Sequence, residues 1–266
     1  MLQLKSFEDI SGFDAGWLNA KHHFALGPYG NPAHKAVGNL IVLNDDEIAP
    51  HTGFGLHYHE NIEIVTYLRE GTVTHRDDKG NLGKTQAGDV QVMSAGTGIR
   101  HSEQNEEDVP IRLFQIWLRP SSAGGIPRWG SKPFPKAGRA GVFVPLASGR
   151  NAEGALPIRT DAEVYGALLR AGAKTSYSFC KGDAGYLVPA TGEVEVSGVQ
   201  VHAREGWVIE NEEMIAIKAL TDSNSYSSSQ LSNCPAALQP AGMTSKTDSD
   251  KGKEFRKCKR LSAKGN

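Results

Sequence analysis

The sequence predicts an all-β protein built from two β-barrel domains. Short segments rich in β-branched and aromatic residues recur along the chain, and turn-forming residues separate them. The chain has 266 residues, with 30 glycines and 13 prolines, which is long enough for two modest domains with many turns. A weak internal repeat is the third observation. The same order of features occurs within residues 70–90 and again within residues 192–207: a glycine that begins a strand, a tight turn, and an acidic residue next to a glycine where the next strand begins.

The first half of the chain contains four predicted strands. Each is rich in β-branched and aromatic residues, and sequences such as Asp77–Asn81 and Ala95–Gly98 have the composition of the turns between them. Evidence for helices is thin, and Ser6–Leu18 is expected to hold about one helical turn at most. The predicted strands are Asn39–Leu43, Ile62–Leu68, Val90–Met93 and Ile111–Leu118.

A break follows Pro120. The glycine- and proline-rich residues 123–138 are predicted to be a linker between an N-terminal domain, residues 1–122, and a C-terminal domain, residues 139–222. Residues 223–266 are rich in serine and in basic residues, have few large apolar side chains, and are predicted to be a disordered tail. Strand patterns return in the second domain at Ala162–Leu169, Tyr186–Val188, Glu193–Val196, Val199–His202, Trp207–Ile209 and Ile215–Leu220.

The composition excludes several classes of protein. Lys plus Arg total 29 and Asp plus Glu total 30, so the chain lacks the basic excess of a protein that binds nucleic acid directly. No apolar run approaches the roughly 18 residues of a membrane span, and the first residues do not have the pattern of a secretory signal. The three cysteines are far apart and odd in number, so no disulfide framework is expected. We therefore expect a cytoplasmic protein.

Two pairs of alternate residues stand next to predicted strands. His57 and His59 precede one strand, and His101 and Glu103 precede another. In extended chain, residues two apart face the same way, so the two pairs facing each other across a small barrel would make a site of three nitrogens and one oxygen. That ligand set suits Fe2+, Mn, Co, Ni or Cu and leaves positions for a substrate. The other six histidines are each interpreted as surface or hydrogen-bonded residues.

These residues resemble the two motifs of the cupin superfamily. The matching positions are His57, His59, Glu63 and Gly71 for the first motif, and Gly88, His101 and Asn105 for the second. More narrowly, stretches such as Gly53–His59 and Gly88–Glu103 resemble the pirin family, in particular its bacterial quercetin dioxygenases. The resemblance is dense over residues 5–120 and continues weakly to residue 222.

The resemblance implies a bicupin, in which two jelly-roll barrels (double-stranded β-helices) pack together and only the N-terminal barrel holds a metal. It implies that His57, His59, His101 and Glu103 bind one divalent ion, Fe2+ in the first place, with Mn, Co, Ni, Cu or Zn as alternatives. Glu103 is also the expected catalytic base. Glu63 is expected to hydrogen bond to a ligand imidazole and orient it, with direct binding of the metal as the alternative. A monomer is expected, because two barrels in one chain need no partner.

The implied activity is ring opening of a flavonol such as quercetin by O2, with release of carbon monoxide and a depside. An alternative is a non-catalytic, iron-binding redox sensor that acts through protein–protein contacts, and a third is another cupin reaction of a small molecule. The four ligands do not separate these functions, but the site's shape does. An apolar cleft reaching the metal favours an aromatic substrate, and a blocked channel favours the sensor.

The chain departs from the family pattern in two places. His51 stands where the first cupin motif usually has glycine. Pirin-like chains normally finish with an apolar strand soon after the position of Thr221, and this sequence is polar there. The closing strand is therefore expected to be absent or replaced, and its absence would leave an unpaired sheet edge in the second domain.

Overall fold

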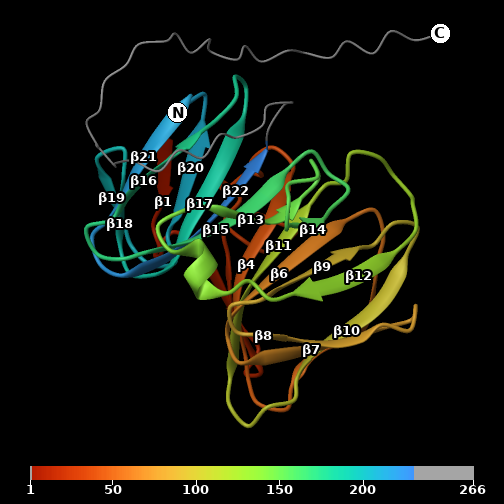
Figure 1. Cartoon of the computed structure of the whole chain (residues 1–266). Coiled ribbons are helices and arrows are strands. Elements are labelled where there is room, and N and C mark those ends of the chain that lie inside the picture. The colour runs from red at the N-terminus through yellow and green to blue at the C-terminus, as the bar shows by residue number, and fades with distance from the viewer. Residues whose placement is uncertain (1, 231–266) are drawn as a thin grey trace, which may run out of the picture.

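Two β-units follow one another along the chain, and each combines a seven-stranded with a four-stranded sheet (Figure 1). The computed structural model describes residues 2–230, without the side chains of residues 136 and 225–230. The strands pair antiparallel except β13 with β14, and the described residues include one short 3-10 helix, η1 (Lys136–Arg139). No helix within residues 2–230 has the length and apolar character needed to cross a membrane. The expected all-β architecture of two units is thus confirmed.

The N-terminal unit contains all the strands around the predicted metal ligands. In spatial order, its seven-stranded sheet is β12 (Arg128–Lys132), β9 (Val90–Ser94), β6 (Glu63–Glu70), β11 (Ile111–Leu118), β4 (Leu40–Ile48), β3 (Leu18–His22) and β2 (Ser11–Asp14). Its four-stranded sheet is β5 (Gly53–His59), β10 (Ile99–Asn105), β7 (Thr72–Asp77) and β8 (Leu82–Gln86).

The C-terminal unit repeats this plan. Its seven-stranded sheet is β1 (Leu2–Lys5), β20 (Gly206–Glu210), β17 (Ala184–Thr191), β22 (Ser223–Gln230), β15 (Glu163–Leu169), β13 (Val144–Ser148) and β14 (Leu156–Pro157). Its four-stranded sheet is β16 (Lys174–Ser178), β21 (Met214–Ala219), β18 (Val194–Val196) and β19 (Val199–Val201).

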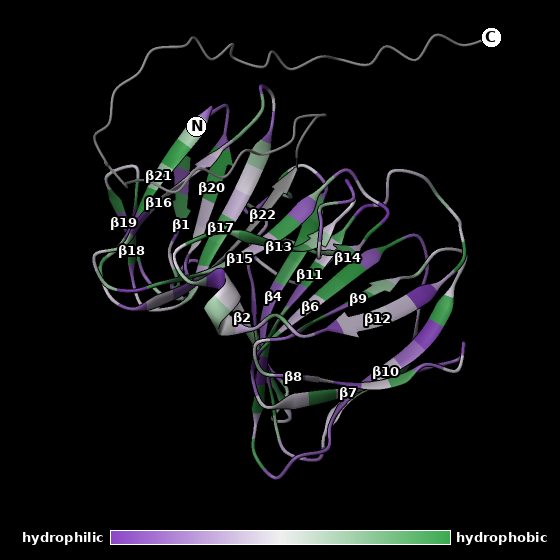
Figure 2. Cartoon of the chain, in the orientation of Figure 1, coloured by the Kyte–Doolittle hydropathy of each residue, from purple (hydrophilic) through white to green (hydrophobic). Residues whose placement is uncertain are grey.

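The two seven-stranded sheets share a hydrophobic core. Val65 and Phe114 of the N-terminal unit belong to the same buried cluster as Val164 and Val188 of the C-terminal unit. Figure 2 shows the hydrophobic residues concentrated along these strands and the hydrophilic residues in the connecting loops. Since sheets with one apolar face must bury it, each unit covers the face of the other.

Two predicted boundaries in the N-terminal half are wrong. The expected linker contains β12, which pairs with β9 and extends the N-terminal sheet, so the glycines and prolines around it mark turns on both sides of a strand. The segment β1 belongs to the C-terminal unit, where its red ribbon lies among the strands of the second sheet in Figure 1. Within Ser6–Leu18 the chain makes a single turn, in which the backbone N–H groups of Asp9 and Ile10 both donate to the carbonyl of Ser6, and the strand β2 follows it.

The closing strand is replaced by a polar one, and the unpaired edge expected in its absence does not occur there. β22 (Ser223–Gln230) pairs with both β15 and β17 in the middle of the seven-stranded sheet. Hydrogen bonds to both neighbours come from the backbone, which every residue supplies, so a polar sequence can complete the sheet. The rest of the predicted tail, residues 231–266, lies outside the described residues.

Candidate metal centre

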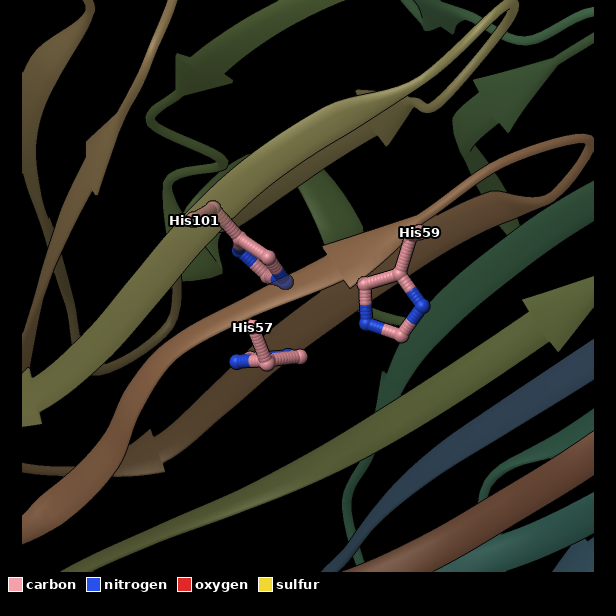
Figure 3. Close-up of side chains that lie close together, drawn as sticks. All are labelled: His57, His59 and His101. Atoms are coloured by element: carbon pink, nitrogen blue, oxygen red, sulfur yellow. The ribbon is translucent and has the colours of Figure 1, made fainter.

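The strands β5 and β10 bring the predicted histidines together. They are neighbours in the four-stranded sheet, and His57 lies directly opposite His101 in their register. The ring centroids are 4.8 Å apart for His57 and His59, 4.4 Å for His57 and His101, and 5.1 Å for His59 and His101. Figure 3 shows the three imidazoles turned toward one another, two from β5 and one from β10.

A bulge in the ladder between β5 and β10 fixes the orientation of His57. The register shifts between His101 and Glu103, so that β5 has one residue more than β10 over this stretch. The imidazole Nδ1 of His57 lies 2.7 Å from the carbonyl oxygen of Gly55. A carbonyl can only accept, so Nδ1 carries the proton and Nε2 is left with a free lone pair. Bulges commonly aim side chains in this way next to functional sites.

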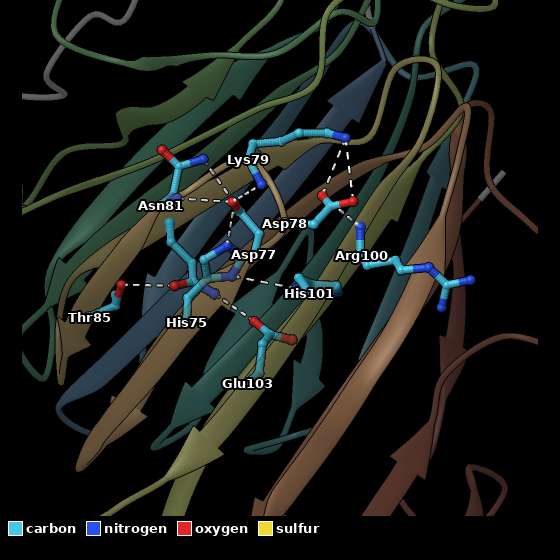
Figure 4. A network of polar contacts seen from close by, with 10 residues as sticks. His75, Asp77, Asp78, Lys79, Asn81, Thr85, Arg100, His101 and Glu103 are labelled. Atoms are coloured by element: carbon cyan, nitrogen blue, oxygen red, sulfur yellow. Dashed lines mark hydrogen bonds and ion pairs between the residues drawn. The ribbon is translucent and has the colours of Figure 1, made fainter.

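A chain of hydrogen bonds fixes the orientation of His101 in the same way (Figure 4). Nε2 of His75 lies 3.0 Å from Oδ2 of Asp77, and Nδ1 of His75 lies 3.4 Å from Nδ1 of His101. The Asp77 carboxylate accepts from Nε2 of His75, so Nδ1 of His75 accepts from Nδ1 of His101. The ring of His75 is also stacked on Trp129, with centroids 4.7 Å apart and planes 9° apart. Nε2 of His101 is therefore left with a free lone pair.

This arrangement fits a divalent metal ion. Nε2 of His101 is buried and has no hydrogen-bond partner among the described residues. Burial, with a further contribution from His57, lowers the pKa of His59 to about 4. Burial and the neighbouring histidines lower the pKa of His101 to about 2. Both rings are neutral near pH 7, which is the form that binds metals.

Glu103 lies beside His101 and is clamped by three donors. Its Oε1 accepts from Gln91 Nε2 at 2.5 Å and from Thr66 Oγ1 at 3.4 Å, and its Oε2 accepts from Gln115 Nε2 at 2.7 Å. Complete burial outweighs these hydrogen bonds and raises the pKa of Glu103 to about 7. Each carboxylate oxygen keeps lone-pair capacity for a metal or a proton.

The structure does not gather all four predicted ligands equally. The nitrogens of His57, His59 and His101 lie within 4.8 Å of one another. A carboxylate oxygen of Glu103 lies within the same distance of nitrogens of His101 and His75, and forms a second group with them. Three histidines thus form one cluster, and Glu103 adjoins it on the side of His101.

Glu63 does not have the role expected from the sequence. Its Oε2 accepts from Ser94 Oγ at 2.6 Å and from the backbone N–H of Arg159 at 3.0 Å, so it joins the two β-units. The expectation assumed one continuous strand from the histidines to Glu63. In fact β5 ends at His59 in one sheet, Asn61 takes a left-handed φ of 51°, and β6 begins at Glu63 in the other sheet.

A cavity of about 350 Å³ opens beside the histidines. His57, His59 and Glu103 form part of its wall, and most of the remaining wall is apolar or aromatic, including Trp17 and Trp117. Volumes of roughly 300–1,000 Å³ are typical of small-molecule sites. The cluster of histidines is therefore accessible to a small, largely apolar molecule.

Sequence reasoning missed His75 and Asp77 as parts of this site. His75 is hydrogen bonded, as expected, but it is fully buried against a predicted ligand. The signal was the alternation of His75 with Asp77 in a β-rich segment, which is the same spacing as in the two predicted pairs. The amide donors Gln91 and Gln115 left no such signal, because glutamine is common on exposed strand faces.

Both β-units match known protein families. The Pirin family profile matches residues 5–118, and that of the quercetinase C-terminal cupin domain matches residues 145–225. A pirin-like protein of Caulobacter vibrioides is 56% identical over 223 residues, which cover 84% of this chain and 96% of the relative. A quercetin 2,3-dioxygenase of Escherichia coli is 35% identical over 225 residues, 84% of this chain and 96% of the relative.

Solved structures give the same result. The bacterial pirin YhhW of Escherichia coli, in complex with nickel(II), superposes with a TM-score of 0.82 at 32% identity. The superposition covers 87% of this chain and 99% of that protein. With sequence profiles, relatives and fold in agreement over both β-units, the chain belongs to the pirin family.

Proposed function

We propose that this chain is a metal-dependent dioxygenase that opens the heterocyclic ring of a flavonol such as quercetin. The observation that carries the proposal is the cavity with aromatic walls that reaches His57 and His59. A planar aromatic substrate fits such walls, whereas a redox sensor needs no cavity at its metal. The names of relatives, among them the quercetin 2,3-dioxygenase of Escherichia coli, support the same activity.

In this proposal His57, His59, His101 and Glu103 hold one divalent ion, Fe2+ in the first place, with Mn, Co, Ni, Cu or Zn as alternatives. The ion would supply a Lewis acid next to the reacting atoms and a site where flavonol and O2 meet. The hydrogen bonds from His57 to Gly55 and from His101 to His75 keep both rings oriented with Nε2 toward the cluster.

Glu103 is the proposed base. The 3-hydroxyl of the flavonol must lose its proton before the ring becomes rich enough in electrons to react with O2. A carboxyl with a pKa of about 7 can accept that proton and return it near neutral pH. Gln91 and Gln115 hold the carboxyl in place while it does so. In the overall reaction both atoms of O2 enter the depside, and one ring carbon leaves as carbon monoxide.

The test measures O2 uptake and carbon monoxide release by the full chain after anaerobic loading with Fe2+, and in parallel with Ni2+ or Mn2+. Quercetin is the substrate, flavone without the 3-hydroxyl is the control compound, and His101→Ala is the control protein. We expect one O2 consumed and one carbon monoxide released per quercetin with at least one metal, and neither with flavone or with the variant. Protein that binds one metal per chain and binds quercetin but consumes no O2 would refute the dioxygenase and favour the sensor.

A further inference from the structure

The wall of the cavity beside the histidines contains one buried acid that the proposed reaction does not use. Asp46 lies on β4 and lines the same cavity as His57, His59 and Glu103. Only 1% of its surface is exposed, and neither carboxyl oxygen has a hydrogen-bond partner among the described residues. Native proteins rarely leave both oxygens of a buried carboxyl without partners, so this one requires an explanation.

Three other acidic or amide side chains near Asp46, namely Asp45, Glu103 and Gln115, all have hydrogen-bond partners. Asp45, which points to the opposite face of β4, accepts from Arg69 and from Arg204. Glu103 accepts from three donors, and Gln115 donates to Glu103 and accepts from Trp117. Asp46 differs from these groups in having a cavity where its partner would be.

The chemical form of Asp46 follows from its surroundings. Burial, reinforced by the negative charges of Asp45 and Glu103, raises its pKa well above the usual value. These surroundings favour the neutral carboxylic acid, which has one O–H donor and one carbonyl acceptor. Such a group pairs best with a ligand hydroxyl, which can both donate and accept.

The rest of the wall fits an aromatic ring. Phe13 and Tyr29 meet edge to face with centroids 5.8 Å apart, and His22 stacks on Tyr29 at 5.8 Å with planes 19° apart. Trp17 meets Phe54 edge to face at 5.2 Å. Besides Asp46, Nε2 of His22 is also buried in this wall without a partner among the described residues. Mostly apolar walls with a small number of placed polar groups are typical of sites that orient a small ligand.

We propose that Asp46 recognises a hydroxyl of the aromatic substrate other than the one that reacts, and so selects polyhydroxylated over singly hydroxylated rings. The inference rests on the proposed function in that the same substrate occupies the cavity. It deepens that function by naming the substrate class, planar polyphenols, and the residue that distinguishes them. Sites built to bond a hydroxyl discriminate strongly against analogues without it, because the buried group then stays unpaired.

The test compares binding of quercetin and of 3-hydroxyflavone, which keeps only the reacting hydroxyl. Asp46→Leu keeps the branched shape and removes both oxygens, and Asp46→Asn keeps a donor and an acceptor. Binding is followed under anaerobic conditions on metal-loaded protein by quenching of tryptophan fluorescence, because Trp17 and Trp117 line the cavity. We expect Asp46→Leu to weaken quercetin binding by about tenfold to a hundredfold and to leave 3-hydroxyflavone binding unchanged. Asp46→Asn should weaken quercetin binding by only a few-fold.

Thermal unfolding of the same proteins without ligand gives a second readout. An unpaired buried carboxyl costs stability, so Asp46→Leu should raise Tm by several degrees, whereas loss of a structural residue would lower it. A lowered Tm, or an unchanged ratio of the two affinities in Asp46→Leu, would overturn the proposal. Binding of quercetin to the wild-type protein without O2 uptake would refute the dioxygenase and leave the recognition by Asp46 standing. If the wild-type protein binds neither compound, the aromatic ligand class is wrong and both proposals fall.

Discussion

Replacing Glu103 by glutamine tests how firmly the carboxyl is clamped. Trp117 Nε1 can only donate, and it bonds Oε1 of Gln115 at 3.0 Å, so the amide nitrogen of Gln115 must face Glu103. The hydroxyl of Thr85 donates to Oε1 of Gln91 at 3.0 Å and orients that amide in the same way. A glutamine at position 103 would therefore set its own amide nitrogen against one of these two nitrogens.

Two effects of this substitution on the free energy of unfolding oppose each other. The loss of one hydrogen bond and the unpaired buried donors cost about 1–3 kcal/mol at any pH. Against this, burial raises the pKa of Glu103 in the folded state from its usual 4.5 to about 7, so ionisation of the carboxyl destabilises the folded state. A raised pKa means stability that is present below about pH 4.5 and is lost as pH rises to about 7, amounting to about 3 kcal/mol by pH 8. Glu103→Gln removes this loss.

The assay is denaturant unfolding of the metal-free full chain at pH 5 and at pH 8. We expect Glu103→Gln to be less stable than the wild-type protein at pH 5 and equal or more stable at pH 8. The difference between the two proteins should change by about 2–3 kcal/mol over this range, because histidine titrations common to both cancel. The double variant Glu103→Gln with Gln115→Glu restores one N–H···O pair and should recover part of the loss at pH 5.

Glu106→Gln is the matched control for this pH dependence. Glu106 lies just beyond β10, and hydrogen bonding to Arg76 lowers its pKa. A lowered pKa stabilises the folded state above the usual pKa of 4.5, so its removal should cost nearly the same at pH 5 and at pH 8. If the difference between Glu103→Gln and the wild-type protein is the same at both pH values, the ionisation of Glu103 is not linked to folding, and the reasoning fails.

Three further predictions concern the metal centre and the interface between the units. His101→Ala should abolish stoichiometric metal binding but keep the far-ultraviolet circular dichroism spectrum of a β-protein. The control His202→Ala changes an exposed residue of the C-terminal unit and should still bind the metal. Metal content is measured by elemental analysis, and stoichiometric metal in both variants would contradict the ligand assignment. His75→Leu removes the hydrogen bond that orients His101 and should weaken metal affinity about 10–100-fold in a competition with a chromophoric chelator, and an unchanged affinity would show that His75 only packs. Asp45→Ala leaves the buried Arg69 without its acidic partner and should cost about 3–5 kcal/mol in denaturant unfolding, so a loss below about 1 kcal/mol would count against a buried ion pair there.

The metal ligands could be predicted from the sequence because their geometry is local. Two residues at alternate positions of a strand share a face whatever the rest of the fold does, so the pair His57 and His59 was readable. His75 could not be placed in the same way. It meets the centre because β7 pairs with β10 in a register that sets His75 opposite Glu103, and that register is a long-range property.

The missed strands had a different cause. Propensity describes how side chains fit a half-buried surface, and the strands β12 and β22 are held by backbone pairing to neighbours that the sequence does not mark. The substitution at His51 is explained by the structure only in part. His51 takes a left-handed φ of 54°, the region that favours glycine, and its Nε2 bonds Oδ1 of Asp108 at 2.9 Å.

The strand β1 gives this chain an unusual order of assembly during synthesis. Leu2 lies opposite Ile209, so β1 pairs with a strand that is synthesised about 200 residues later. At roughly 5–20 residues per second, β1 waits about 10–40 s for β20. Until β20 has been synthesised, β1 has no strand to pair with, and the N-terminal unit can fold while β1 remains unpaired. If the two units were expressed as separate fragments, the N-terminal fragment would carry β1 without its partner β20. The C-terminal fragment would expose β20 as an unpaired sheet edge.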